Sequence, residues 1–158
     1  MKFKQSLIEN DSVLLNALAT DWRSAIKIGT DMLIRSGAVE PGYHDAIISS
    51  IEKMGPYIVI APHFAMPHAR PEDGVNRTAF ALVTLASPVK FEGEEELVDV
   101  LITLAGSTSD EHMEGLMEVT QVLEDENSDS GINLDKFRAC RSVEDVYLVI
   151  DEALAQEV

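Results

Sequence analysis

Two continuous apolar runs near the middle of the chain predict two buried strands of a sheet. They are TAFALVTLA, at residues 78–86, and VDVLITLA, at residues 98–105. Ser87-Pro88 ends the first run and Gly106 ends the second, and both are strong stop signals. Runs that are apolar at nearly every position are typical of strands covered on both faces. The pattern therefore predicts a sheet between two layers of helices.

Apolar residues at three- and four-residue spacing predict the helices that form those layers. Asp21 and Glu40-Pro41 are suited to begin the first two helices, and Gly37 and Gly55 are suited to end them. The predicted helices run from Thr20 to Gly37, from Glu40 to Gly55, from Ser109 or Asp110 to Leu123, from Leu134 to Ala139 and from Ser142 to Leu154.

The pattern is weaker near the N-terminus and after the third helix. Residues 1–10, MKFKQSLIEN, mix charged and apolar positions, which predicts a short strand or an extended lead-in. Asp11 or Ser12 is a candidate cap for a short helical turn over residues 13–18. Residues 124–131, EDENSDSG, are acidic and rich in turn formers, so we expect an exposed loop.

These elements predict an α/β fold, in which a mixed, mostly parallel sheet is covered by helices on both faces in three α/β/α layers. The chain has 158 residues, 46% of them apolar and 25% charged, which is ordinary for a soluble globular protein. A chain of this length buries about 70% of its unfolded surface. No repeat or linker interrupts the pattern, so we expect residues 1–158 to form a single domain.

The charge balance is strongly acidic, with 28 Asp and Glu against 12 Lys and Arg and a formal net charge of −16. Such a field repels nucleic acid and anionic membrane and attracts basic partners, although it also serves simply to keep a protein soluble. No apolar run is long enough to span a bilayer, and the N-terminus has no signal-peptide pattern. We therefore expect a cytoplasmic protein without membrane insertion or nucleic-acid binding.

The single cysteine, Cys140, cannot form an internal disulfide. It lies between Arg138 and Arg141, whose charges would favour a reactive thiolate, but a packing cysteine near a helix end is the commoner case. The chain has no Cys/His spacing of the metal-binding kind, so we expect no metal and no other cofactor.

Residues 57–71, YIVIAPHFAMPHARP, carry two of the four histidines, each directly after a proline at the end of a short apolar run. They are His63 and His68. A proline fixes its own φ and restricts the residue before it, so an imidazole on such a segment is pre-positioned. A further histidine, His112, opens a helix just past the strand at residues 98–105. Ligands of open α/β sheets usually bind off strand ends, where such loops and helix N-termini meet.

Three interpretations fit these histidines. The first is a phosphohistidine site, with His68 as nucleophile, His112 as a hydrogen-bonding supporter and Arg70 neutralising the phosphoryl oxygens. The second is a metal site of His63, His68 and His112, which is disfavoured because His63 and His68 would face opposite sides of an extended chain. The third is that His68 is simply a polar residue in a strand-end loop.

Several segments resemble an enzyme IIA domain of the phosphoenolpyruvate-dependent sugar phosphotransferase system. The resemblance is to the mannitol/fructose type (type 2), and within it most to the ascorbate-specific (SgaA/UlaC-like) members. It covers nearly the whole chain, and its most specific parts are Ala65-Met66-Pro67-His68 and Glu111-His112 to Leu116. The other similar segments are GPYIVIAP at residues 55–62, SPVKF at residues 87–91 and LITLAGSTSD at residues 101–110.

This resemblance implies a phosphotransferase with a phosphohistidine intermediate. Nε2 of His68 would accept phosphate from the small phosphocarrier protein HPr and pass it to a cysteine of enzyme IIB, whose membrane-embedded IIC partner moves the sugar. His112 maps onto the family's second active-site histidine, which contacts the phosphoryl group. Nitrogen-type relatives share the fold but act by phosphorylation-dependent protein binding, so a regulatory role is the alternative. The sugar and the oligomeric state, including a homodimer, stay open.

The chain departs from the family pattern in the basic residue that is expected to stabilise the phosphate. Mannitol-type members have an arginine at the helix end before the motif, where this chain has Glu52-Lys53. Lys53 or Arg70 would therefore have to stabilise the phosphate. His63 stands where relatives commonly have a small residue, and no function is carried over to it.

Overall fold

The computed structural model describes residues 2–155, and these form six α-helices, one short 3₁₀ helix and five strands. In chain order the elements are α1 (Lys2–Asn10), β1 (Val13–Ala17), α2 (Trp22–Arg35), α3 (Pro41–Met54), β2 (Val59–Ala61), β3 (Phe64–Ala65), η1 (Pro71–Asp73), β4 (Ala79–Val89), β5 (Val98–Ala105), α4 (Ser109–Leu123), α5 (Asp135–Arg138) and α6 (Val143–Ala155).

The strands form one mixed sheet in the order β1-β4-β5-β3-β2. The β1/β4 and β3/β5 pairs are parallel, whereas the β4/β5 and β2/β3 pairs are antiparallel. The two long apolar runs of the sequence form strands, as predicted, and these are β4 and β5, which both lie inside the sheet. This order places the end of β3, where the Met66-Pro67-His68 segment begins, beside the end of β5, where α4 follows.

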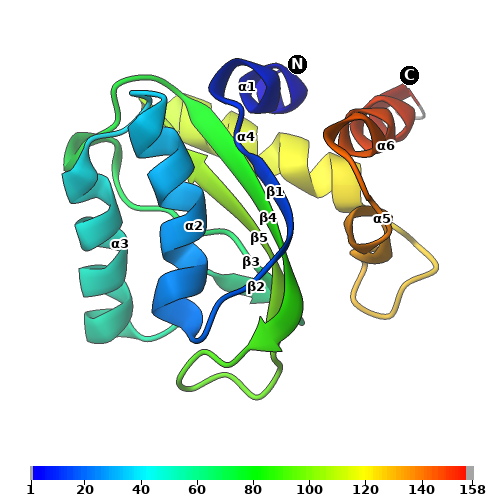
Figure 1. The fold of residues 1–158 in the computed structure, drawn as a ribbon, viewed down its shortest axis with the longest axis horizontal. Helices are drawn as coiled ribbons and strands as arrows, with labels where there is room; N and C mark the ends of the chain where they lie inside the picture. The colour runs from blue at the N-terminus through cyan, green and yellow to red at the C-terminus, as the bar shows by residue number, and fades with distance from the viewer. Residues whose placement is uncertain (1, 156–158) are drawn as a thin grey trace.

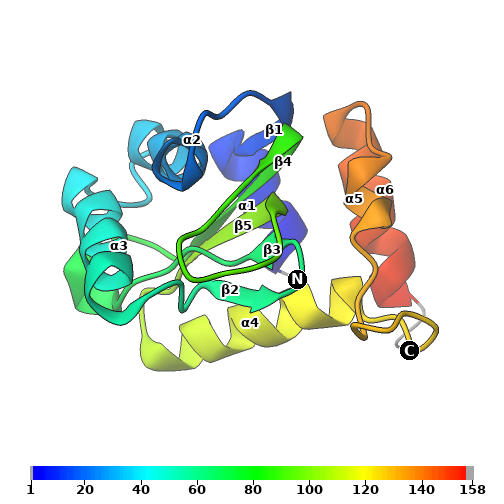
Figure 2. The ribbon, with the colours of Figure 1, turned by 90° about the horizontal axis from the view of Figure 1, so that it is seen from below.

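Helices cover both faces of the sheet, which confirms the predicted three layers (Figures 1 and 2). Alternate residues of β4 divide between the two cores: Ala81 and Val83 pack with α2 and α3, whereas Phe80 and Leu82 pack with α1, α4 and α6. This period of two is the expected consequence of strand geometry. The central strands are apolar on both sides because each side has its own core.

The N-terminal prediction was wrong in both of its parts. Residues 2–10 form a helix, and residues 13–17 form a strand that pairs with β4. In α1 the fully buried hydrophobic side chains are Phe3 and Leu7, four residues apart, and this single pair in a short polar segment is a weak helical signal in the sequence. Ser12 does not cap a helix; its hydroxyl donates to the Phe80 carbonyl and aligns β1 with the sheet.

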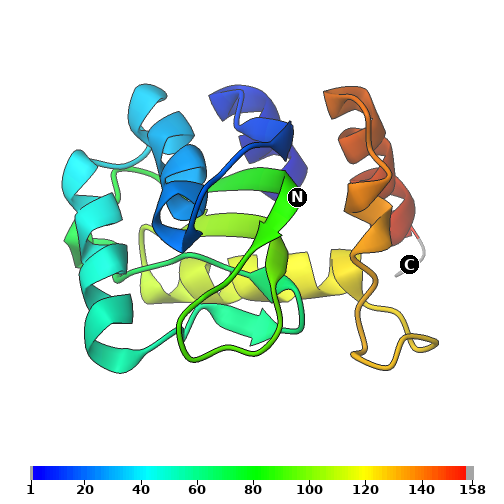
Figure 3. The same cartoon turned by 60° about the horizontal axis from the view of Figure 1, so that its bottom comes forward.

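Other boundaries agree closely with the sequence pattern. Asp21 caps α2 by accepting a hydrogen bond from the Ser24 amide, and β5 has the predicted bounds. The predicted end of β4 at Ser87-Pro88 lies where the pairing with β5 is interrupted, although the strand continues to Val89. The acidic segment 124–131 projects as a loop between α4 and α5 (Figure 3).

Candidate functional site

An open hollow of about 730 Å³ lies between the end of α3, the segment after β3 and the first turn of α4. His68, His112, Lys53 and Arg70 all line it, so the structure brings together the four candidate residues of the sequence. They come from α3, from the segment after β3 and from α4, and the last two meet at one end of the neighbouring strands β3 and β5.

The backbone around His68 is tied to the end of β5 on both sides. The Leu104 amide donates to the Pro67 carbonyl at 3.0 Å. On the other side, the fully buried Tyr43 hydroxyl accepts from the Ala69 amide at 3.0 Å and donates to the Leu104 carbonyl at 2.8 Å. These bonds hold His68 in place without using its side chain.

The His68 ring has one nitrogen committed to the backbone. Nδ1 lies 2.6 Å from the Met66 carbonyl oxygen, which can only accept, so Nδ1 carries the proton and Nε2 carries the lone pair. Tyr57 stands edge-on to the ring, with 5.1 Å between centroids, and its hydroxyl donates to the His68 carbonyl. Burial lowers the pKa of His68, although the Met66 hydrogen bond acts in the opposite direction. The lowered pKa favours the neutral ring.

His112 is brought to the site by the start of α4. Thr108 caps this helix by accepting from the Glu111 amide at 3.1 Å, one residue before the predicted cap. Gly106 lets the turn approach β5, since a Cβ there would lie 2.7 Å from both Cα and Cβ of His112. The His112 ring centroid lies 5.0 Å from that of His68.

The His112 ring differs from the His68 ring in its hydrogen bonds. Its Nδ1 is buried and has no hydrogen-bond partner among the described residues. Burial, and then the proximity of His68, lower the pKa of His112. Both rings are therefore expected to be neutral near pH 7.

Lys53 and Arg70, the two basic side chains that line the hollow, differ in whether they form an ion pair. Arg70 pairs with Asp73 at 3.3 Å, and this carboxylate raises the pKa of the guanidinium. Lys53, in the last turn of α3, forms no ion pair within residues 2–155. Its charge is therefore available to an anion in the hollow.

His63 is not part of this hollow. It borders a different hollow of about 590 Å³ near the acidic loop, its Nδ1 lies 2.8 Å from the Leu97 carbonyl oxygen, and its Nε2 lies 3.5 Å from the Glu96 carboxylate. Three histidines are therefore not gathered at one point. Among the described residues, no group of three or more His, Cys, Asp or Glu side chains is placed to hold a metal ion.

The structure also bears on the environment of Cys140 and on membrane-spanning helices. Cys140 is buried, its thiol donates to the Lys136 carbonyl at 3.3 Å, and burial raises the pKa of the thiol, as suits a packing cysteine. No helix within residues 2–155 is both long and apolar enough to cross a bilayer.

Two tyrosines of the site were missed by the sequence analysis. The hydroxyls of Tyr57 and Tyr43 form hydrogen bonds with backbone atoms of other segments, and no sequence motif indicates such contacts. For Tyr43 a signal was available, because it shares four-residue spacing with Ile47 and Ile51 on the buried face of α3. A phenol on that face requires a buried hydrogen-bond partner.

An α/β/α fold that presents two neighbouring imidazoles and two basic side chains in one open hollow has the features of a histidine-dependent phosphoryl-transfer protein. A sequence model of the family "Phosphoenolpyruvate-dependent sugar phosphotransferase system, EIIA 2" matches residues 6–153. The chain belongs to this family and is a phosphotransferase. The resemblance found in the sequence is confirmed.

Individual relatives agree with this assignment. The chain is 46% identical over 157 residues to the "Ascorbate-specific PTS system EIIA component" of Salmonella typhimurium, covering 98% of this chain and 99% of the relative. A crystal structure of a putative PTS IIA(PtxA) from Streptococcus mutans superposes with a TM-score of 0.88 at 39% identity, covering 98% and 96% of the two chains. The nitrogen regulatory protein IIA-Ntr from Neisseria meningitidis shares the fold, with a TM-score of 0.67 at 16% identity over 89% and 94%.

Proposed function

We propose that this chain is the phosphoryl carrier of an ascorbate-type sugar phosphotransferase system. It accepts phosphate from phosphorylated HPr on His68 and passes it to a cysteine of enzyme IIB, whose IIC partner moves the sugar. The observation that carries the proposal is the pair of imidazoles in one open hollow, with 5.0 Å between the His68 and His112 centroids.

The tautomer of His68 supports Nε2 as the phosphoryl acceptor. Because Nδ1–H is bound to the Met66 carbonyl, the lone pair lies on Nε2. In the first step this lone pair forms a bond to phosphorus while the N–P bond of HPr breaks, and the electron pair returns to the HPr imidazole. In the second step a thiolate of enzyme IIB attacks phosphorus, and the Nε2–P electron pair returns to His68.

His112 is proposed to stabilise the phosphoryl group without carrying it. A proton on its buried Nδ1 would have no acceptor among the described residues, so the proton is better placed on Nε2. From there it donates to a phosphoryl oxygen held on the neighbouring ring. Such a donor lowers the energy of the transferring group, whose charge is spread over its equatorial oxygens.

Lys53 is proposed as the main cation for the phosphoryl charge. It lines the hollow and forms no ion pair within the described part of the chain, whereas Arg70 is neutralised by Asp73. Arg70 has the secondary role of contributing to the positive potential at the entrance, since its side chain is 75% exposed.

The transport role is preferred to the regulatory one. The 46% identity to an ascorbate-specific component spans nearly the full length of both chains, whereas the 16% identity to the nitrogen regulatory protein supports the fold alone. We place this function in the cytoplasm, in one domain over residues 1–158. No cofactor is needed, because the donor's N–P bond already drives transfer.

Transfer of phosphate from this chain to enzyme IIB provides the test of the proposed transport role. The phosphorylated chain, freed of HPr and enzyme I, is mixed with an ascorbate-type IIB protein or, as a control, with a mannitol-type IIB protein. We expect phosphate to move to the ascorbate-type cysteine at least about tenfold faster, the scale of modest substrate discrimination. Equal rates, or transfer to neither protein, would contradict the proposed transport role.

A further inference from the structure

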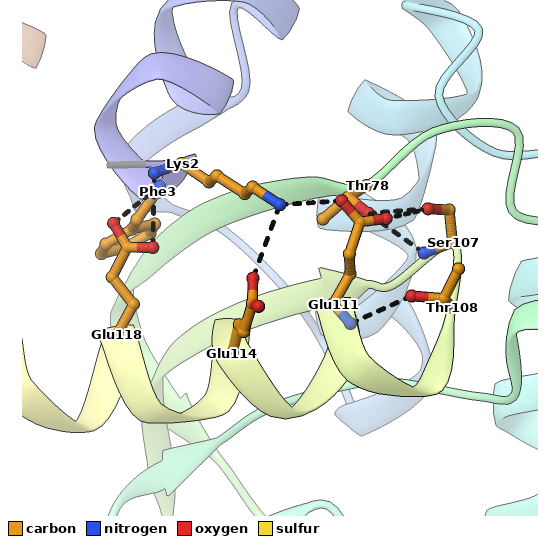
Figure 4. A network of polar contacts seen from close by, with 8 residues as sticks. All are labelled: Lys2, Phe3, Thr78, Ser107, Thr108, Glu111, Glu114 and Glu118. Atoms are coloured by element: carbon orange, nitrogen blue, oxygen red, sulfur yellow. Dashed lines mark hydrogen bonds and ion pairs between the residues drawn. The ribbon is translucent and has the colours of Figure 1, made fainter.

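The first turn of α4 is held by a carboxylate that the proposed mechanism does not use. Glu111 directly precedes His112, and its Oε2 accepts from the Thr78 hydroxyl at 2.8 Å and from the Ser107 hydroxyl (Figure 4). Its Oε1 accepts from the Lys2 ammonium at 2.8 Å. One carboxylate thus accepts hydrogen bonds from three donors in three different segments.

Two of those donors, Thr78 and Lys2, come from distant parts of the chain, and the third, Ser107, lies four residues before Glu111. Thr78 precedes β4, Ser107 lies between β5 and α4, and Lys2 begins α1. Thr78 and Ser107 are also joined directly, because the Ser107 amide donates to the Thr78 hydroxyl at 3.1 Å. Glu111 therefore ties the start of α4 to two central strands and to the N-terminal helix.

The charge of Glu111 is stabilised by this arrangement. The hydrogen bond from Lys2, followed by those from Ser107 and Thr78, lowers the pKa of Glu111 to about 2. The carboxylate therefore stays ionised, and acts as an acceptor, down to a lower pH than an ordinary glutamate would. A protonated acid would lose at least one of the three contacts.

The same turn is also held by close packing. The backbone of His112 lies against Gly106, where there is no room for a Cβ. Contact with Gly106 limits movement of the turn toward β5, and the Glu111 contacts limit movement away from it. Between them the position of the His112 Cα is fixed from two directions.

We propose that Glu111 is a positioning residue for His112. Its contacts to Lys2, Thr78 and Ser107 hold the first turn of α4 so that the His112 imidazole stays beside His68. Glu111 itself does not touch the phosphoryl group. The inference rests on the proposed role of His112 in phosphoryl transfer.

A double-mutant cycle separates positioning from a general structural role. The rate of transfer from the phosphorylated chain to IIB is measured for wild type, Glu111→Ala, His112→Ala and the double variant. We expect Glu111→Ala to slow transfer about tenfold or more, as a displaced catalytic group does. In the His112→Ala background the same change should have little further effect, because there is no imidazole left to position. Equal losses in both backgrounds would overturn the proposal.

Glu118→Ala is the matched control. Glu118 is on the same helix and also binds α1, accepting from the Lys2 and Phe3 amides at 3.3 and 3.0 Å, but it does not contact Thr78 or Ser107. We expect it to transfer phosphate at nearly the wild-type rate. A loss equal to that of Glu111→Ala would mean that docking of α1, and not the Glu111 contacts, is what matters.

A second measurement covers the case in which a variant folds poorly or the wild type takes no phosphate. Glu111→Gln keeps the shape and one acceptor oxygen, and NMR follows the nuclear Overhauser contact between the His68 and His112 rings. We expect this contact to weaken in Glu111→Gln and to persist in Glu118→Ala. An unchanged contact would overturn the positioning role. A wild-type chain that accepts no phosphate would contradict the proposed function instead.

Discussion

His68 and His112 have the same side chain but different hydrogen-bond surroundings, and these surroundings suit them to different tasks. Nδ1 of His68 is bound to the Met66 carbonyl, whereas Nδ1 of His112 has no partner in the described chain. The first ring can therefore offer a lone pair and the second a hydrogen bond. Because burial lowers both pKa values, neither ring needs to lose a proton first.

His112→Ala is expected to accept phosphate and to pass it on slowly. The loss in the rate of transfer to IIB should be about ten- to a thousandfold, the effect of one missing transition-state donor. Rapid-quench kinetics measure this rate. His63→Asn is the control, since His63 lies outside the hollow and asparagine tolerates its positive φ of 71°. If His112→Ala takes no phosphate while His68→Ala does, the two roles are reversed.

Lys53→Met and Arg70→Met are expected to differ. Loss of the unpaired Lys53 should slow phosphate acceptance by about tenfold or more. Loss of Arg70, exposed and already paired with Asp73, should cost no more than about fivefold, as for other exposed ion pairs. Initial rates with phosphorylated HPr provide the comparison. A larger loss for Arg70→Met would make Arg70 the principal cation.

The site could be predicted in part from the sequence. The chemistry of His68 and His112 was visible because each follows a strand end, and strand ends converge. Lys53 and Arg70 could be named only as alternatives for the phosphate-stabilising cation, since the pairing of Arg70 with Asp73 depends on the η1 turn. Tyr57 was not predictable, because its partner is a backbone carbonyl eleven residues away along a folded segment.

Two connections between secondary-structure elements determine the distance between the imidazoles. One leads from β3 through Pro67 to His68, and the other leads from β5 through Gly106 into α4. The first is fixed by hydrogen bonds to Leu104, and the second by the close approach that a glycine allows. A change in either connection should alter transfer without removing any group that touches phosphate.

Gly106→Ala is expected to impair both stability and transfer. The new Cβ would lie 2.7 Å from the backbone of His112, so the start of α4 must shift, at a cost of about 1–3 kcal/mol. Urea unfolding and transfer to IIB measure the two effects. Gly42→Ala is the control: its Cβ would meet nothing closer than 4.0 Å, and we expect no loss. An unaltered transfer rate in Gly106→Ala would show that this contact does not position His112.

The elements that the sequence predicted well are those with one clear period. β5 is apolar at six of its eight positions, and the apolar spacing of α2 is bounded by Asp21 and Gly37. The predictions for the residues of α1 and β1 were wrong because each segment is short and its pattern is ambiguous without its neighbours. β1 is an edge strand that leaves Leu14 45% exposed, so hydrophobicity alone did not distinguish it from a helical turn.

The molecule as a whole carries a formal charge of −16 while its hollow presents Lys53 and Arg70. Under the proposed function, the overall field would attract a donor protein with a basic surface, and the local cations would receive the phosphate. Met54 and Met113, which are 69% and 57% exposed, provide apolar surface at the same hollow. Charge thus favours encounter, and local chemistry performs the transfer.

The rate of phosphate acceptance is therefore expected to depend on salt. At subsaturating HPr, raising the ionic strength from about 0.05 to 0.5 M should slow acceptance at least fivefold, because screening removes long-range attraction. Initial rates across a salt series test this, with saturating HPr as the control, where the loss should be small. A rate independent of salt would mean that the acidic charge only maintains solubility.

The most direct test of the account is phosphate transfer from phosphoenolpyruvate through enzyme I and HPr to the wild-type chain and to His68→Ala. Intact mass and peptide mapping follow the product. The account predicts one acid-labile, base-stable phosphate on the peptide that contains His68, and none on the variant. Phosphate on another residue, or a wild-type chain that takes none from a competent HPr, would contradict the claim that His68 carries the phosphoryl group.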